Sequence, residues 1–115
     1  MAKFDGIEII SSNQYAGATT EGAYKASENL LNNYAELDGI FCPNESAAFG
    51  MLRALQDSER TKTAKFIGFD ASDKLVAALR EGEVDALVLQ DPVRMGDLAV
   101  RACVDQIRGL SLIHI

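Results

Sequence analysis

The sequence predicts an α/β fold, a three-layer arrangement in which alternating βα units build one parallel sheet. Two observations predict it. Short apolar runs rich in β-branched and aromatic residues recur along the chain, and each is followed by polar residues and then by apolar residues at helical spacing. Strands that alternate with helices in this way favour a parallel sheet with right-handed crossovers. At 115 residues the chain is expected to form one small domain.

The best-defined unit runs from 38 to 55. Ile40, Phe41 and Cys42 form an apolar run too short for a helix, between Gly39 and Pro43, which predicts a buried strand. Asn44 stands where a helix begins and is a preferred N-cap residue. The apolar residues that then recur at helical spacing are Ala47, Ala48, Met51, Leu52 and Leu55.

The other elements follow the same pattern. Strands are predicted at 6–11, 64–69 and 84–89, in addition to 38–43. Helices are predicted from Thr19 or Thr20 to about 33, from 44 to about 57, from Ser72 or Asp73 to Gly82, and from Pro92 to about 109.

Composition narrows the functional classes. The apolar fraction is 48%, the charged fraction is 24%, and the net charge is −6, with eleven scattered Lys and Arg residues. No basic patch is present, so no nucleic-acid partner is expected. No apolar run reaches about 18 residues. The start of the chain lacks the apolar core of a signal peptide, so we expect the signal sequence to be absent from this chain.

The reactive residue types do not form a catalytic or metal-binding pattern. Cys42 and Cys103 are interpreted as small buried hydrophobic residues rather than as a disulfide pair. His114 is the single histidine and lies next to the end of the chain, which makes it a poor general base. No catalytic residue, metal site or cofactor is therefore predicted.

Polar clusters follow each predicted strand, at 11–14, 44–46, 70–72 and 90–91. Because parallel strands point their carboxyl ends to one edge, these clusters should share that edge, where ligands bind in open α/β sheets. Their Asn, Asp and Gln side chains combine donors and acceptors, which suits a ligand with many hydroxyls. Three alternatives stay open: Asn44 as a simple N-cap, Asp70 as a helix cap, and Gln90 as an ordinary loop residue. An acid–base pair of Glu45 and Asp70 lacks a third group to use it.

Three segments carry a resemblance to a known family. DGIFCPNESAAFGMLRAL, KFIGFDAS and VDALVLQDPVRMG, in that order, resemble the C-terminal lobe of type I periplasmic sugar-binding proteins, the ribose-binding-like receptors of ABC importers. The resemblance covers about 6–109. It implies a non-enzymatic sugar-binding function in which Asn44, Asp70 and Gln90 hydrogen-bond a monosaccharide or related polyol. The family's stacking aromatic has Tyr15 as its nearest counterpart, offset from the usual spacing.

The resemblance also implies what this chain lacks. A full receptor holds its ligand between two lobes, whereas this chain carries one partial lobe, at 6–110, followed by a tail of uncertain origin at 111–115. The lobe's opening strand and helix, which carry a ligand-contacting Arg, are missing. We therefore expect weak or absent binding of free sugar, and a homo-oligomer, because one sheet edge and the inter-lobe surface are uncovered.

The setting implied for the full-length protein is periplasmic, or extracellular with a lipid anchor. Its expected partners are the membrane subunits of an ABC importer.

Two other functions are alternatives to sugar binding for an ABC importer. The effector-binding domain of a LacI-type transcription regulator shares the fold, but the Pro-rich, Thr-containing run of those regulators and their DNA-binding headpiece are absent here. The second alternative is a small flavodoxin-like enzyme or a receiver domain. A receiver needs clustered acids after its first strand, where this chain has Ser11, Ser12 and Asn13.

Overall fold

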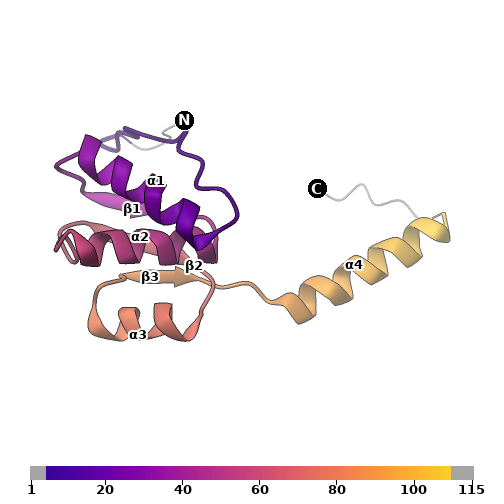
Figure 1. Ribbon diagram of the computed structural model, residues 1–115. Helices are drawn as coiled ribbons and strands as arrows, with labels where there is room; N and C mark the ends of the chain where they lie inside the picture. The colour runs from indigo at the N-terminus through magenta and orange to yellow at the C-terminus, as the bar shows by residue number, and fades with distance from the viewer. Residues whose placement is uncertain (1–4, 110–115) are drawn as a thin grey trace.

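The computed structural model describes residues 5–109 and shows an α/β body followed by a projecting helix (Figure 1). The elements in chain order are α1 (Thr20–Asn33), β1 (Gly39–Phe41), α2 (Glu45–Asp57), β2 (Lys65–Phe69), α3 (Asp73–Glu81), β3 (Ala86–Val88) and α4 (Pro92–Ile107). The predicted tail at 111–115 and the predicted lobe end at 110 lie outside the described residues.

The three strands form one parallel sheet in the order β1-β2-β3. Gly39 pairs with Lys65 across β1 and β2, and Ile67 pairs with Ala86 across β2 and β3. The α/β class, the parallel sheet and the alternation of strands and helices are thus confirmed. The N-caps of the first two helices are Thr19 and Asn44, within the predicted starts.

The predicted first strand at 6–11 is wrong. This segment has no strand conformation, and Ile7, Ile9 and Ile10 are all exposed. A strand needs hydrogen-bond partners for its backbone, and β1 ends the sheet on this side without reaching the segment. The β-branched side chains of the segment indicated a strand, but the neighbour that would pair with it is not in the described chain.

Helices α1, α2 and α3 lie on one side of the sheet (Figure 1). On that side Phe66 is almost completely buried. On the opposite side Phe41, Ile67 and Val88 are exposed. The expected third layer is therefore absent from residues 5–109: one face of the sheet is covered and the other is open.

Close backbone approach holds the covered layer together. A Cβ atom added at Gly50 of α2 would lie 2.6 Å from the Cβ of Ala23 on α1. A Cβ atom added at Gly68 of β2 would lie 3.1 Å from the Cβ of Ala48 on α2. Glycine at these two positions lets α2 pack directly on α1 and on the sheet.

Two polar contacts fix the ends of elements far from the carboxyl edge of the sheet. Arg60 donates to the carbonyl oxygens of Leu31, Tyr34 and Ala35, at 2.7, 3.0 and 2.7 Å, and so satisfies acceptors at the end of α1.

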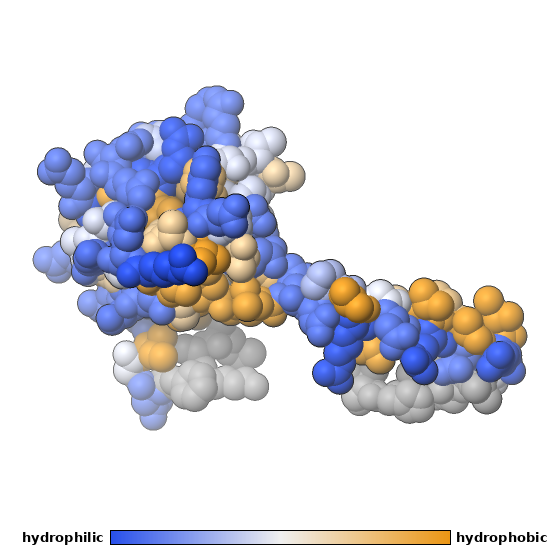
Figure 2. Space-filling view, turned by 90° about the horizontal axis from the view of Figure 1, so that it is seen from below, coloured by the Kyte–Doolittle hydropathy of each residue, from blue (hydrophilic) through white to orange (hydrophobic). Residues whose placement is uncertain are grey.

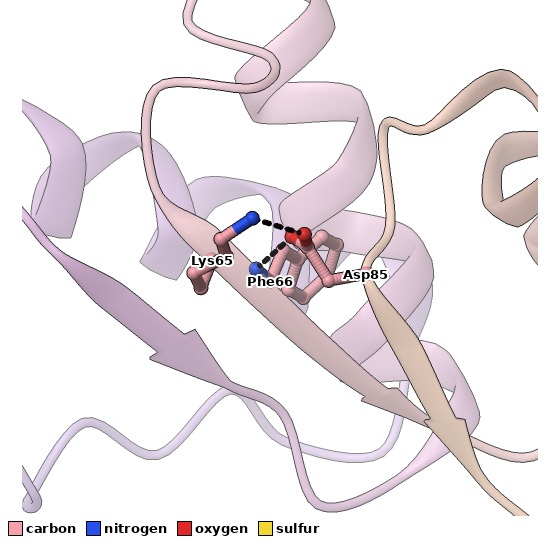
Figure 3. Close-up of polar contacts among 3 residues, drawn as sticks. All are labelled: Lys65, Phe66 and Asp85. Atoms are coloured by element: carbon pink, nitrogen blue, oxygen red, sulfur yellow. Dashed lines mark hydrogen bonds and ion pairs between the residues drawn. The ribbon is translucent and has the colours of Figure 1, made fainter.

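The second contact joins β3 to β2. The Asp85 carboxylate accepts from the backbone N–H of Phe66 at 2.8 Å and from Lys65 Nζ at 2.9 Å (Figure 3). These two bonds lower the pKa of Asp85, with the Phe66 N–H as the larger cause.

Helix α4 begins at Pro92, with Asp91 Oδ1 accepting from the Arg94 backbone N–H at 3.0 Å as its N-cap. None of its residues is buried, and Val100 and Ile107 are 64% and 85% exposed. The helix extends away from the body (Figure 1). Among residues 5–109, no helix is both long and apolar enough to cross a membrane.

Candidate functional site

Asn44 begins α2 directly after β1 and serves as its N-cap. Its Oδ1 accepts from the Ala47 backbone N–H at 2.9 Å and from Ser46 Oγ at 3.0 Å. The capping interpretation is therefore confirmed. The capping bonds use the carbonyl oxygen, and the Asn44 amide NH₂ has no partner within residues 5–109, so it remains available as a donor.

Asp70 follows β2 in a backbone conformation that is unusual for a residue with a side chain. Its φ is 65°, in the left-handed region, which costs a non-glycine residue about 1–2 kcal/mol. Its backbone N–H donates to the Val88 carbonyl at 2.8 Å. The alternative in which Asp70 caps α3 is wrong, because Ser72 occupies the N-cap position.

Gln90 follows β3 and meets Asp70 side chain to side chain. Its Nε2 donates to Asp70 Oδ1 at 2.9 Å. Gln90 is thus more than an ordinary loop residue: it holds one carboxylate oxygen of Asp70 in place. The other oxygen, Oδ2, accepts no hydrogen bond from the described part of the chain.

A cavity of about 660 Å³ lies at this edge of the sheet, and both Asn44 and Asp70 line it. Sequence reasoning did not find Thr20, Phe49 and Lys74 as lining residues. Thr20 is the first residue of α1, and Asn44 is the N-cap of α2. The position of Thr20 at the start of a helix could therefore have indicated that it lies near Asn44. The Lys74 ammonium lies 4.7 Å from the centre of the Phe49 ring. The full lining consists of Thr20, Asn44, Glu45, Ser46, Phe49, Asp70, Ser72, Asp73 and Lys74.

Tyr15 and the 11–14 cluster are not brought to this cavity. Tyr15 is 90% exposed and is absent from the lining. Since 6–11 forms no strand, the residues after it are not delivered to the carboxyl edge. Three of the four predicted site residues are therefore assembled: Asn44 and Asp70 line the cavity, and Gln90 is bonded to Asp70.

The two cysteines differ from each other. Cys42 is buried as predicted, and burial raises the pKa of its thiol to about 12, so it is protonated at neutral pH. The prediction that Cys103 is buried is wrong: it is exposed, as part of a helix in which no residue is buried. In the same range, no group of three His, Cys, Asp or Glu side chains is placed to hold a metal ion.

Polar side chains around a cavity, at the carboxyl edge of a parallel sheet, are the arrangement at which open α/β proteins bind ligands. Comparison with known proteins identifies which kind. The model of the family described as "Periplasmic binding protein domain" matches residues 1–111, and the chain belongs to this family. Members of this family are periplasmic substrate-binding proteins rather than enzymes.

The chain is similar to both curated and structurally solved relatives. It is 33% identical to the ribose import binding protein RbsB of Bacillus subtilis over 82 residues, covering 71% of this chain and 26% of that protein. A periplasmic component of an ABC-type sugar transport system from Hahella chejuensis superimposes with a TM-score of 0.81 at 41% identity, covering 96% of this chain and 40% of that one. An ABC transporter solute-binding protein from Agrobacterium vitis, solved with bound D-fucose, gives 0.74 at 26% identity, covering 89% and 35%.

The chain therefore spans between about a quarter and two fifths of the length of these relatives.

Proposed function

We propose that the chain is the ligand-contacting part of a solute-binding protein for an ABC sugar importer, and that it binds a monosaccharide or related polyol without catalysing a reaction. One observation carries the proposal: Asn44 and the bonded pair of Asp70 and Gln90 meet at the carboxyl edge of the sheet, beside the same cavity. The relatives named above support it, since they are a ribose import protein, a sugar transport component and a D-fucose complex.

The hydrogen-bonding capacity of the site suits neighbouring hydroxyl groups. Asn44 offers an amide donor, and Asp70 offers the carboxylate oxygen that Gln90 does not occupy. A donor and a charged acceptor at one edge match a diol, because each sugar hydroxyl both accepts and donates. Gln90 fixes the rotamer of Asp70, so less side-chain freedom is lost when a ligand binds.

The affinity of the chain alone should be low. Asn44 and the Asp70–Gln90 pair contact a ligand from one side only, and a sugar bound there keeps much of its surface in water. The part of the relatives that this chain does not match is the source expected for the second side. Tyr15, which is exposed and does not line the cavity, contributes to binding only if the 11–19 segment changes position.

The test compares two glutamine variants by NMR-detected titration with D-ribose, D-fucose and D-allose. Gln90→Ala should abolish the sugar-induced shifts. The matched control Gln106→Ala, on exposed α4, should leave them unchanged. Equal loss in both variants, or shifts that survive in Gln90→Ala, would contradict the site. Micromolar affinity of the unaltered chain would contradict one-sided binding.

The wider setting is part of the same proposal. In the longer protein we expect a periplasmic or lipid-anchored extracellular location and docking on the membrane subunits of an importer. The three relatives reported above include no transcription regulator, so the LacI-type alternative gains no support from them. Self-association of the chain stays a prediction.

A further inference from the structure

The polar lining of the cavity sets it apart from the apolar surfaces of the chain. Exposed hydrophobic side chains gather on α4 and on the open sheet face, which is formed by Phe41, Ile67 and Val88. Figure 2 shows hydrophobic side chains along α4 and at the side of the body next to it. The cavity, in contrast, is lined by polar or charged residues except for Phe49. Its unused hydrogen-bonding groups are therefore the features that can specify a ligand.

Ser72 is one of three residues with a hydroxyl side chain among the described residues that line the cavity, and it is half-buried. The hydroxyl of Ser46 is engaged, because it donates to Asn44 Oδ1 at 3.0 Å. The third hydroxyl belongs to Thr20 of α1. Ser72 comes only two residues after Asp70, so these two side chains leave the same short loop between β2 and α3.

The Ser72 side chain occupies an N-cap position but makes no capping hydrogen bond. The other three helices of residues 5–109 each have a side-chain cap: Thr19 Oγ1 accepts from the Gly22 N–H at 3.1 Å, and Asn44 and Asp91 cap α2 and α4. Serine is preferred at an N-cap because its oxygen accepts from an unpaired backbone N–H. Within the described part of the chain the Ser72 hydroxyl makes no hydrogen bond of any other kind, so it is free to bind a ligand.

We propose that Ser72 is a third ligand-contacting group of the sugar site, and that its hydroxyl bonds the ligand hydroxyl adjacent to the one that Asp70 holds. This inference rests on the proposed function. Asn44 offers an amide donor, Asp70 offers a carboxylate acceptor, and Ser72 offers a group that both donates and accepts. The three groups fit three neighbouring oxygens of one ligand. The site therefore selects polyols with three contiguous hydroxyls over analogues that lack one of them.

The amino end of α3 favours an uncharged oxygen at this position. The first N–H groups of a helix have no partner within the helix, so its amino end carries a partial positive charge and attracts oxygen atoms. An unbalanced helix start of this kind would also suit an anion such as phosphate. Asp73 adds a carboxylate to the first turn of α3 and offsets that charge. A neutral hydroxyl beside Ser72 is thus a better fit than a phosphate or carboxylate group.

NMR titration of the full chain tests the proposal, with the side-chain amides of Asn44 and Gln90 as reporters. The ligand is whichever of D-ribose, D-fucose and D-allose binds the unaltered chain most tightly. Ser72→Ala should raise its dissociation constant about fivefold, the effect of losing one neutral hydrogen bond. One monodeoxy analogue of that sugar should bind the unaltered chain about fivefold more weakly than the sugar itself. The same analogue should lose no further affinity in Ser72→Ala, because the partner of the serine is already missing.

Thr19→Ala is the matched control, because the Thr19 hydroxyl does cap its helix. It should lower the midpoint of urea denaturation and leave sugar affinity unchanged, whereas Ser72→Ala should leave the midpoint unchanged. A lowered midpoint with unchanged affinity in Ser72→Ala would show an ordinary helix cap and overturn the inference. Unchanged affinity in Ser72→Ala, beside the loss expected in Gln90→Ala, would overturn the inference and leave the proposed function standing. No sugar-induced shift in the unaltered chain would overturn both.

Discussion

Replacing Gly50 by alanine should destabilise the body by pushing α1 and α2 apart. The added Cβ would lie 2.6 Å from Ala23 Cβ, 2.7 Å from the Tyr24 backbone nitrogen and 2.8 Å from the Ala23 carbonyl carbon. Two of these three atoms are backbone, so no side-chain rotation relieves the contact. The two helices must separate, and the buried side chains beneath them lose their packing.

The magnitude follows from two opposing terms. Alanine gains about 1 kcal/mol over glycine in helix propensity. Overpacking a tight interior costs about 1–3 kcal/mol, and contact with backbone places Gly50 at or above the upper end of that range. We expect a net loss of about 2 kcal/mol in the free energy of unfolding, measured by urea denaturation followed by circular dichroism.

The matched control is Gly39→Ala, at a strand position where the added Cβ would meet only the Lys65 carbonyl oxygen at 3.7 Å. This is ordinary contact, and the change in stability should stay within about 0.5 kcal/mol. A Gly50→Ala variant as stable as the unaltered chain would refute the close approach of α1 and α2. So would equal losses in the two variants.

Three further predictions concern single polar or reactive groups. Arg60→Lys should lower the free energy of unfolding by about 1–2 kcal/mol in urea denaturation, because an ammonium cannot reach three carbonyl oxygens as the guanidinium fork does. An unchanged urea midpoint would contradict a stabilising role of the Arg60 hydrogen bonds. Asp85→Asn should lower the free energy of unfolding at neutral pH. The difference between the variant and the unaltered chain should shrink as the pH falls below the ordinary carboxyl value of 3.8 and through the lowered pKa of folded Asp85, because the carboxylate is then protonated. A difference that does not depend on pH would exclude the charge of Asp85 as its cause. In a Cys103→Ser background, Cys42 should react with a thiol reagent only at the rate of unfolding, because burial raises its pKa to about 12; fast reaction in the folded state would show that the thiol is accessible.

The elements that sequence reasoning located correctly are those whose signals are local. Asn44 is a favourable N-cap followed by helical periodicity, and it caps α2 as expected. The run at 65–69 is a short apolar segment before a polar exit, and it forms β2. Because parallel strands share an edge, the meeting of Asp70 and Gln90 at that edge also followed from the order of elements.

The predictions that were wrong concern features that depend on contacts with other parts of the protein. The 6–11 segment has the residues of a strand, but a strand forms only against a neighbour, and none is present in 5–109. Cys103 was expected to be buried because α4 is apolar, yet burial requires a surface for the helix to pack on. The left-handed φ of Asp70 likewise has no local signal, because an aspartate in that region is held there by its contacts.

The side-chain amides of Asn44 and Gln90 give the most direct view of the proposed sugar site, because both can be followed by NMR in one sample. Titration with a monosaccharide should move the Gln90 Nε2 and Asn44 Nδ2 resonances together, with the same apparent affinity, ahead of any resonance from the open sheet face or α4. Shifts confined to those other surfaces, or no shift at either amide with any pentose or hexose, would contradict a sugar-binding edge at the carboxyl ends of the strands.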